Sequence, residues 1–562
     1  MTPLHPALPL FAAAALQAVV RPRWRGPVAF LGALGGLAAV AALPAGAALQ
    51  VSLLGLELRL LEADRLARLF ALVFAAMAGL GTLYAMHVGR GGEHAATLVY
   101  AGSALGVVLA GDWVSLLLFW ELMAVSSTLV VWQGGQARSR AAGFRYLFVH
   151  LASGMLVLAG VLWLYADGVR SVGPVPPGTA FGLLLTGVAV NAAIPPLHAW
   201  LTDAYPEASV TGSVFLSAFT TKSAVYVLLR AFPGTEALVW AGAAMALYGV
   251  VYAVLENDIR RLLGYHIVSQ VGYMVAGVGM GTPLALDGAA AHAFCHILYK
   301  GLLFMGAGAV LAATGRRKLT ELGGLGPRLK LVSALYMVGA FSISGAPLFN
   351  GFVSKSMVVS AAAEGWPAIE LLLTLASIGT FLHTGLKLPY FTFLGPTRGI
   401  EPRPLPRNML AAMGVAALLC TALGVFPGWL YARLPLEAAY VPYTLDHVVS
   451  SVQLLLGTGV AFVVLLPRLA GEATISLDTD WLYRRPLRRA VAGAVRASGA
   501  AGRRFEEAGR RVAAALSLLA ADPLRGGAPY DPDAQRLPVG LTIFWAVAAL
   551  GLVALLIGWP GP

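Results

Sequence analysis

Runs of apolar residues recur from one end of this 562-residue chain to the other, and they limit its fold more than any other feature. We count sixteen runs. Each is about 20 residues long, which as a helix crosses a hydrocarbon core of roughly 30 Å. Helices satisfy their own backbone hydrogen bonds inside a bilayer. Since 58% of the residues are hydrophobic and 12% are charged, we predict an all-α, polytopic membrane helix bundle.

Basic residues concentrate in alternate loops between these runs. The net charge of +12 therefore indicates membrane orientation rather than a nucleic-acid partner. By the positive-inside rule the basic loops face the cytoplasm, and both termini then face outward in a bacterial or archaeal-type plasma membrane. Residues 50–68 carry arginines on the predicted outer side, and their alternating apolar pattern predicts a short hairpin or interfacial segment. The basic loops are 21–25, 90, 138–145, 260–261, 315–318 and 398–407.

The chain turns polar at about residue 468 and stays so to about 536. Within this segment, residues 482–520 show arginines recurring beside an alanine and leucine face, which predicts an amphipathic helix. That helix is expected either to lie on the anionic inner leaflet or to act as a lateral helix that clamps a neighbouring subunit. A last span is predicted from Val539 to Trp559.

Two of the predicted spans contain breaks. The sequence NAAIPPLHAW at 191–200 places two prolines at the end of an apolar run, and SGAPLFNGFVSK at 344–355 interrupts another run. Proline removes a helix hydrogen bond, so irregular backbone at membrane depth must be satisfied by protein or by a water-filled cavity. Broken helices in two halves of a membrane chain indicate transport through internal repeats.

Several ionisable residues lie inside the apolar runs, where each costs about 2.5 to 3.5 kcal/mol on insertion scales. One of these runs contains three such residues at four-residue spacing, which places them on one helix face. Together they are interpreted as a proton relay, with histidine passing protons and lysine acting as a switchable charge. His383 and His150 are equally well explained as polar plugs in the bundle. The relay residues are Glu121, Lys222, His292, His296, Lys300, Lys355 and Lys387.

Five stretches between about residues 95 and 430 resemble the antiporter-like subunits shared by respiratory complex I, membrane-bound hydrogenases and Mrp-type sodium/proton antiporters. Among these, the chain looks most like the D subunit of the Mrp-type antiporters. The resemblance implies about fourteen core helices with two inverted five-helix repeats. The stretches are FWELM, PLHAWLTDAYPEASVTGSVFLSAFTTKSAVYVLLR, ENDIRRLLGYHIVSQVGYM, HAFCHILYKGLLFMGAGAV and GAPLFNGFVSK.

The resemblance also implies a division of the chain. We expect N-terminal transmembrane helices, a first and a second antiporter-like repeat, an additional transmembrane helix, a cytoplasmic amphipathic or lateral segment, and a final transmembrane helix. In that order the predicted boundaries are 1–94, 95–255, 256–430, 431–467, 468–536 and 537–562.

Individual residues match functional positions of these relatives. Glu121 matches the glutamate of the WEL motif, which in the family pairs with a lysine on the first broken helix. Lys222 matches the central lysine of the next helix. His296 matches the histidine of the second repeat, and Lys355 matches the charged residue at the second break. His292 and Lys300 match further relay positions that some members carry.

One position departs from the family pattern. Counting back from the PLH motif, the first broken helix should carry its lysine where this chain has Asn191. Asparagine cannot change charge. Either Lys222 replaces the missing lysine as partner of Glu121, which we favour, or the first half-channel has altered coupling.

The predicted function is that of an ion-translocating subunit of a multisubunit antiporter, which works alongside other membrane subunits and exchanges protons for a monovalent cation, sodium by family analogy. The alternative is a proton-pumping subunit of a redox-driven complex. A transporter of organic solutes and a passive scaffold subunit are weaker alternatives. The chain shows no iron–sulfur cysteine pattern, dinucleotide-binding fingerprint or P-loop, and Cys295 and Cys420 lie in apolar runs. We therefore expect no cofactor, no metal site and no catalytic chemistry in this chain.

Overall fold

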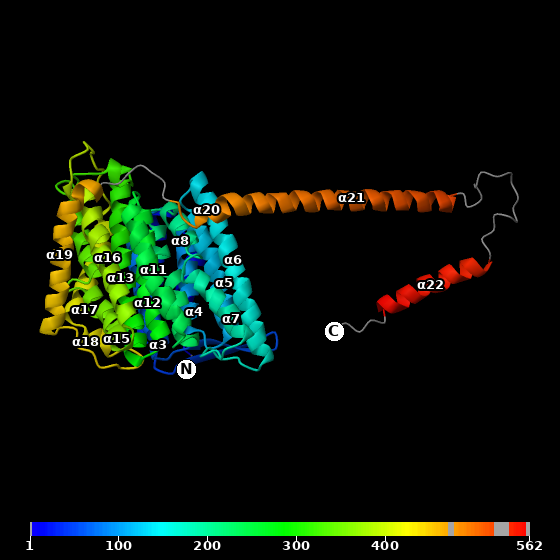
Figure 1. The fold of residues 1–562 in the computed structure, drawn as a ribbon, viewed down its shortest axis with the longest axis horizontal. Helices are drawn as coiled ribbons and strands as arrows, with labels where there is room; N and C mark the ends of the chain where they lie inside the picture. The colour runs from blue at the N-terminus through cyan, green and yellow to red at the C-terminus, as the bar shows by residue number, and fades with distance from the viewer. Residues whose placement is uncertain (1–2, 470–476, 522–538, 558–562) are drawn as a thin grey trace. The chain divides into compact units, whose positions relative to one another are not determined.

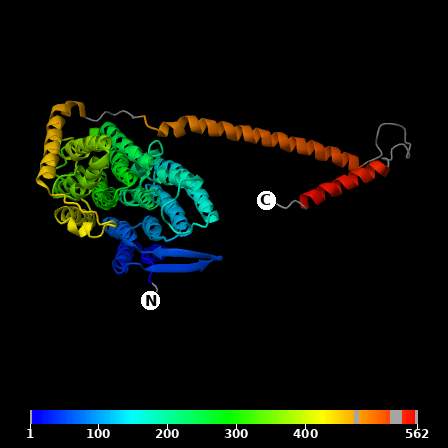
Figure 2. The same cartoon turned by 60° about the horizontal axis from the view of Figure 1, so that its bottom comes forward.

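The structure is a computed structural model that describes residues 3–469, 477–521 and 539–557. The chain divides into two compact units, residues 1–480 and residues 481–562. The first unit is a bundle of antiparallel helices with one β-hairpin, as Figure 1 and Figure 2 show. This architecture confirms the predicted all-α membrane bundle.

The first unit begins with helices that flank the hairpin and continues to the first break. These elements are α1 (Leu8–Leu16), α2 (Pro22–Ala41), β1 (Ala48–Leu53), β2 (Leu56–Glu62), α3 (Arg65–Tyr84), α4 (Gly91–Leu109), α5 (Trp113–Trp132), α6 (Ala137–Ala166) and α7 (Thr179–Asn191).

The middle of the first unit runs from the first break to the second. Its elements are α8 (Ala199–Ala204), η1 (Tyr205–Glu207), α9 (Gly212–Leu216), α10 (Thr220–Ala231), α11 (Glu236–Leu255), α12 (Ile259–Met280), α13 (Pro283–Thr314), η2 (Leu319–Glu321) and α14 (Lys330–Ser344).

The remainder of the first unit follows the second break and includes two π-helical segments. Its elements are α15 (Asn350–Gly365), α16 (Pro367–Thr380), η3 (Phe381–Lys387), η4 (Tyr390–Leu394), α17 (Arg407–Val425), α18 (Gly428–Tyr431) and α19 (Leu445–Leu469).

Successive helices run in opposite directions, so the loops alternate between two ends of the bundle. We call one end the basic face, because Arg90 and Arg317 lie in its loops and Arg138 lies in the first turn of α6 there. We call the other end the hairpin face, because it carries β1 and β2. The hairpin is antiparallel and pairs Ala48 with Glu62, which confirms the hairpin predicted within residues 50–68.

Ten helices among the described residues are long and apolar enough to cross a membrane. The halves of the two broken helices are too short for that count, and Thr179–Asn191 and Lys330–Ser344 appear among the shorter apolar helices. The sixteen runs predicted from the sequence are more numerous than these ten helices, and they include each interrupted run as a single segment. The chain is therefore a multi-pass membrane protein, with breaks at the two predicted places.

The two breaks share an unusual backbone feature. Each contains a residue other than glycine in the left-handed region, Ala193 at φ 59° in the first break and Leu348 at φ 73° in the second. Such conformations cost on the order of 1 to 3 kcal/mol each and gather at functional sites. Side chains with β-carbons would normally avoid them, so the surrounding packing must hold both breaks in place.

Helices α12 and α13 form the centre of the first unit. Nearly all residues of α12 and most residues of α13 are buried. Helix α13 packs against α12, α14, α15, α17 and α3. Asp258 begins α12, because its carboxylate accepts hydrogen bonds from the backbone N–H groups of Arg260 (2.9 Å) and Arg261 (3.3 Å).

The second unit contains the rest of the C-terminal segment. After α20 (Asp480–Leu482) it comprises η5 (Tyr483–Leu487), α21 (Arg488–Ala521) and α22 (Val539–Ile557). Helix α21 is one continuous helix of 34 residues, as the pattern at 482–520 predicts. Helix α22 corresponds to the predicted last span, whose final residues lie outside the described part of the chain.

Candidate proton-translocation site

A row of three titratable side chains runs along the middle of α13. His292, His296 and Lys300 are each fully buried. His292 Nδ1 lies 3.2 Å from Ser354 Oγ on α15, and His292 Nε2 lies 3.5 Å from the hydroxyl of Tyr299. The four-residue spacing places the three groups on one face of the helix, so the structure brings together the row that the sequence predicts.

The second break provides a binding place for the ammonium group of Lys355. Lys355 Nζ donates hydrogen bonds to the carbonyl oxygen of Ile343 (2.9 Å) and to Ser377 Oγ (3.3 Å). Ile343 lies in the last turn of α14, where carbonyl groups lack intrahelical partners and carry partial negative charge. The ring of Tyr273 lies 5.3 Å from the same nitrogen and adds a cation–π contact.

A cavity of about 560 Å³ adjoins Lys355 and extends toward the hairpin face. Its wall is formed by α15, α16, α19 and the segment before α19. Hydroxyl and charged side chains are frequent in the wall, which allows water to enter. The polar and charged residues in the wall include Ser344, Lys355, Ser356, Ser360, Glu370, Thr374, Ser377, Asp446 and His447.

Lys222 connects the first half of the bundle with the α13 row. It is fully buried on α10, and its Nζ donates a 2.8 Å hydrogen bond to the carbonyl oxygen of Ser217 at the end of α9. Its charge acts on His296 and Lys300. Lys222 is thus within electrostatic range of the row.

Among the described residues, no hydrogen bond or ion pair joins Glu121 or Asn191 to this group. Glu121 lies on α5 and packs over the bare backbone of Gly154 on α6, and its Oε1 has no hydrogen-bond partner among the described residues. No ion pair among the described residues joins Glu121 to Lys222. Asn191 is buried at the end of α7. The pairing of Glu121 with Lys222 stays a prediction.

Lys387 lies at the end of the π-helical segment η3. Its Nζ donates hydrogen bonds to the carbonyl oxygens of Val254 (2.5 Å) and Glu256 (3.3 Å), at the end of α11 on the basic face. One helical turn earlier, His383 Nδ1 lies 2.9 Å from Nε2 of His266 on α12. His266 was missed by the sequence interpretation, although its four-residue spacing from Gln270 on a buried helix face could have indicated it.

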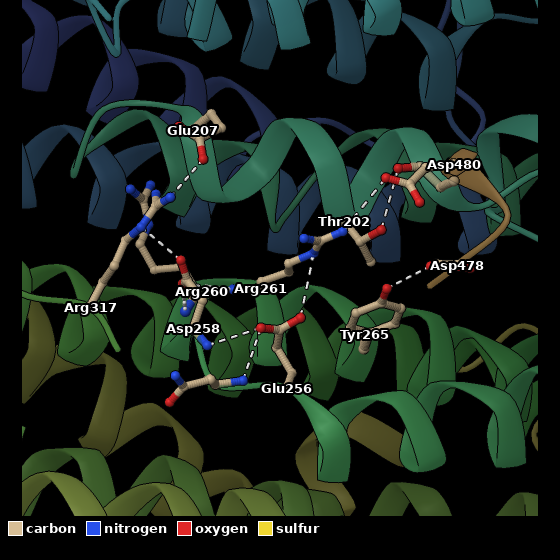
Figure 3. A network of polar contacts seen from close by, with 12 residues as sticks. Thr202, Glu207, Glu256, Asp258, Arg260, Arg261, Tyr265, Arg317, Asp478 and Asp480 are labelled. Carbon is tan, nitrogen blue, oxygen red and sulfur yellow. Dashed lines mark hydrogen bonds and ion pairs between the residues drawn. The ribbon is translucent and has the colours of Figure 1, made fainter. Parts of the chain in front are cut away.

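An ionic network at the basic face joins the two halves of the bundle (Figure 3). Arg317 lies 2.7 Å from carboxylate oxygens of both Glu207 and Asp258. Arg261 lies 3.5 Å from Glu256 and 3.8 Å from Asp480. Glu207 follows the first broken helix and Asp258 begins α12, so Arg317 joins the segment after the first break to the start of α12 at this face.

Asp478 enters the bundle beside this network. Its carboxylate accepts hydrogen bonds from His198 Nε2 (3.2 Å), from the hydroxyl of Tyr265 (2.6 Å) and from the hydroxyl of Tyr248. Burial alone raises the pKa of Asp478, but these hydrogen bonds and the charge of His198 outweigh it and hold the pKa well below its usual range. His198 belongs to the PLHAW motif of the first break. Neither residue was singled out from the sequence.

Residues 110–382 match the membrane family described as NADH:quinone oxidoreductase/Mrp antiporter. An uncharacterised protein of Methanocaldococcus jannaschii is 31% identical over 369 residues, which cover 60% of this chain and 76% of that protein. The chain belongs to this family. The D subunit of the Na⁺/H⁺ antiporter of Bacillus subtilis is 27% identical over 401 residues, covering 66% of this chain and 80% of that protein.

A solved structure of the Mrp complex from Dietzia sp. DQ12-45-1b superimposes with a TM-score of 0.71. The match has 25% sequence identity and covers 81% of this chain and 99% of that chain. The resemblance to antiporter-like subunits is thereby confirmed. The family match includes the α13 row, Lys222, Lys355 and Glu121, and it ends just before His383 and Lys387.

Proposed function

We propose that this member of the NADH:quinone oxidoreductase/Mrp antiporter family is the ion-translocating membrane subunit of a multisubunit monovalent cation/proton antiporter. One observation carries the proposal: the buried α13 row meets α15 at Ser354, and the next residue of α15, Lys355, borders the polar cavity toward the hairpin face. Buried titratable groups in a membrane protein are retained for ion or proton movement. The exchanged cation in this proposal is sodium.

In the proposed mechanism protons move along the α13 row and Lys355 while the cation moves in the opposite direction. Each histidine accepts a proton on one ring nitrogen and releases one from the other. Each lysine alternates between a charged ammonium and a neutral amine, which changes the field on its neighbours. The proton gradient supplies the energy for cation export, and other membrane subunits complete the complex.

The proposed orientation places the basic face in the cytoplasm of a bacterial or archaeal-type cell, with both termini outside. Arginines in the loops of the basic face support it through the positive-inside rule. The two repeats are proposed to span 95–255 and 256–430. The first contains Asn191 where relatives of this type carry lysine, so we propose that either Lys222 serves Glu121 or the first half-channel couples differently.

The second candidate is a proton-pumping subunit of a redox-driven complex. It is favoured by the description of the matched family, which joins NADH:quinone oxidoreductases with Mrp antiporters. The same row of buried groups would serve both functions, since both require protons to cross the bilayer. The two candidates differ in the source of energy, which lies in partner subunits.

The deciding experiment uses the native complex, purified through a tag on this chain and reconstituted into vesicles with an acidic interior. Sodium is added outside and the internal pH is followed. We expect a rise in internal pH that is lost in Lys222→Ala and in His296→Ala. Native gel electrophoresis must show the same subunit composition for the variants as for the wild type.

Each other outcome excludes a specific function. An intact complex that does not respond to sodium, potassium or lithium contradicts the antiporter proposal and supports the redox-driven pump. A sodium response that persists unchanged in both variants identifies the chain as a passive scaffold, because a scaffold needs no titratable groups.

A further inference from the structure

Two buried histidines from different helices face each other between the α13 row and the basic face. His266 on α12 and His383 in η3 are both fully buried, and their facing nitrogens, Nε2 and Nδ1, are 2.9 Å apart. A hydrogen bond at this distance requires one ring to carry the N–H and the other to offer a lone pair. When a proton arrives at the outer nitrogen of the ring that carries the inner N–H, the inner proton passes to the other ring, which releases a proton from its own outer nitrogen. Both rings end neutral, so the pair is suited to passing a proton.

The surroundings of the pair allow both proton positions. His383 Nδ1 also lies 3.1 Å from the hydroxyl of Thr384, which can donate or accept. The outer nitrogens, His266 Nδ1 and His383 Nε2, have no hydrogen-bond partner among the described residues. Buried polar nitrogens in proteins are normally satisfied by protein or ordered water. Each ring therefore presents a free nitrogen through which a proton can arrive or leave.

Lys387 connects the pair to the basic face. It lies one turn from His383 in η3, and its ammonium group rests on the Val254 and Glu256 carbonyl oxygens at the end of α11. Arg261 links the side chain of Glu256 to the ionic network of that face, which Figure 3 shows. The π-helical geometry of η3 supports a functional role, because such segments are frequent at functional sites.

Lys300 connects the pair to the α13 row on its other side. Lys300 lies within electrostatic range of both His266 and His383. The Nζ atom of Lys300 has no hydrogen-bond partner among the described residues, although the side chain is fully buried. A buried amine in this position needs a polar partner, and water between Lys300 and the imidazoles would provide it.

We propose that Lys387, His383 and His266 form a proton route from the basic face to Lys300 within the second repeat. This proposal rests on the proposed proton-translocating function and adds the route by which protons reach the α13 row. Together with Lys355 and its cavity, it gives the second repeat a route from one face of the bundle to the other. The route does not pass through Asn191. It is therefore independent of the charged residue that the first break lacks.

The test measures sodium-triggered pH change in vesicles containing the native complex with His266→Gln, His383→Gln or both changes. Glutamine preserves hydrogen bonding but cannot relay a proton. We expect each single variant to slow transport at least about tenfold, since positioned proton transfer groups contribute factors of this size or more. The double variant should be no slower than the slower single variant, because the two residues act in series.

Two further variants keep the test decisive. Lys387→Gln retains a donor for the same carbonyl oxygens but not the charge, and it should slow transport to a similar degree even if a histidine variant fails to assemble. His150→Gln is the matched control, because His150 is a fully buried histidine of the first repeat outside the proposed route. Transport by that variant should stay within about twofold of the wild type.

The outcomes separate this route from the proposed function. If Lys300→Met abolishes transport while both histidine variants remain within about twofold of the wild type, the function stands and the route is wrong. If the wild type does not respond to sodium, ¹⁵N NMR of histidine-labelled complex decides. An N–H···N signal that disappears in either single variant supports the route, and the absence of that signal in the wild type overturns it.

Discussion

Lys300 tests the functional interpretation at the scale of a single residue. Its ammonium group is fully buried without a hydrogen-bond partner among the described residues. Replacement of a buried charge by an apolar side chain of similar volume is often neutral or stabilising. We therefore expect Lys300→Met to keep or slightly raise the melting temperature of the complex, while transport falls by about 100-fold.

Transport and melting temperature are measured on the same preparation. Lys330→Met is the control, because Lys330 is exposed at the start of α14. A marked loss of stability in Lys300→Met, with transport reduced only in proportion to the protein lost, would assign Lys300 a structural role.

Gly154 offers a way to move the carboxylate of Glu121 without changing its chemistry. A methyl group at position 154 would overlap Glu121 Oε1, and the flexible glutamate side chain can move to avoid it. We expect Gly154→Ala to assemble normally but to slow transport by about tenfold, because misplacement of a proton-handling group by about 1 Å can cost up to 100-fold in rate.

The matched control for this change is Gly182→Ala on α7, where an added methyl group meets no atom within 4 Å. Transport in vesicles is the measurement for both variants. Equal transport by Gly154→Ala and Gly182→Ala would show that the position of the Glu121 carboxylate does not limit the reaction.

Sequence reasoning located the α13 row because its three members follow one another at helical spacing. It did not find the contact between His266 and His383, which are 117 positions apart and lie on different helices. Each of these histidines alone matches the pattern of an ordinary buried polar residue. Their significance arises from the contact between their rings across α12 and η3, which one sequence does not specify.

At the scale of elements, the second break depends on close approach of its two helix ends. Gly351 on α15 sits against the backbone carbonyl of Ser342 on α14, so an added methyl group would overlap that oxygen. Backbone cannot move as easily as a side chain. We expect Gly351→Ala to destabilise the complex by about 1 to 3 kcal/mol and to lower its melting temperature.

Gly365→Ala at the far end of the same helix is the control, because a methyl group there meets no atom within 4 Å. Its effect should stay within about 1 kcal/mol. Equal melting temperatures for the two variants would contradict the tight approach of α14 and α15.

Both breaks, the hairpin and the amphipathic helix could be predicted as elements from local residue patterns. Two prolines at 195–196, and Gly345 with Pro347, interrupt apolar runs, and alternation near residue 50 is typical of strands. The π-helical turns of η3 could not be predicted, because residues 381–387 continue an apolar helix without proline. The segment packs against α14 and α19, which are distant from it in sequence or follow it in the chain.

At the scale of the whole molecule, the hydrogen bond between Asp478 and His198 joins the end of the first unit to the first break. We expect Asp478→Asn to lower the free energy of unfolding by about 1 to 3 kcal/mol, because His198 loses a charged hydrogen-bond partner. The measurement is the melting temperature of the complex between pH 5 and pH 8. Asp167→Asn, at an exposed position, serves as the control.

The pH range of this measurement follows from the direction in which the pKa of Asp478 is shifted. The pKa of Asp478 is lower in the folded protein than the value near 3.9 of an unfolded chain. Its stabilising contribution is therefore complete above about pH 4 and is lost as the pH falls through the folded value. A difference between wild type and Asp478→Asn that vanishes at pH 6 would contradict this contact.

The contact between Asp478 and His198 spans 280 positions of the chain. During synthesis, His198 and both tyrosine hydroxyls are made and inserted long before their carboxylate partner leaves the ribosome. All the helices of the first unit from α1 to α19 precede Asp478 in the chain. The hydrogen bonds of His198 at the first break are therefore completed only when the last residues of the first unit are made. A nascent chain that stops before Asp478 leaves the imidazole of His198 without this carboxylate partner, which the quality-control machinery of the cell can detect.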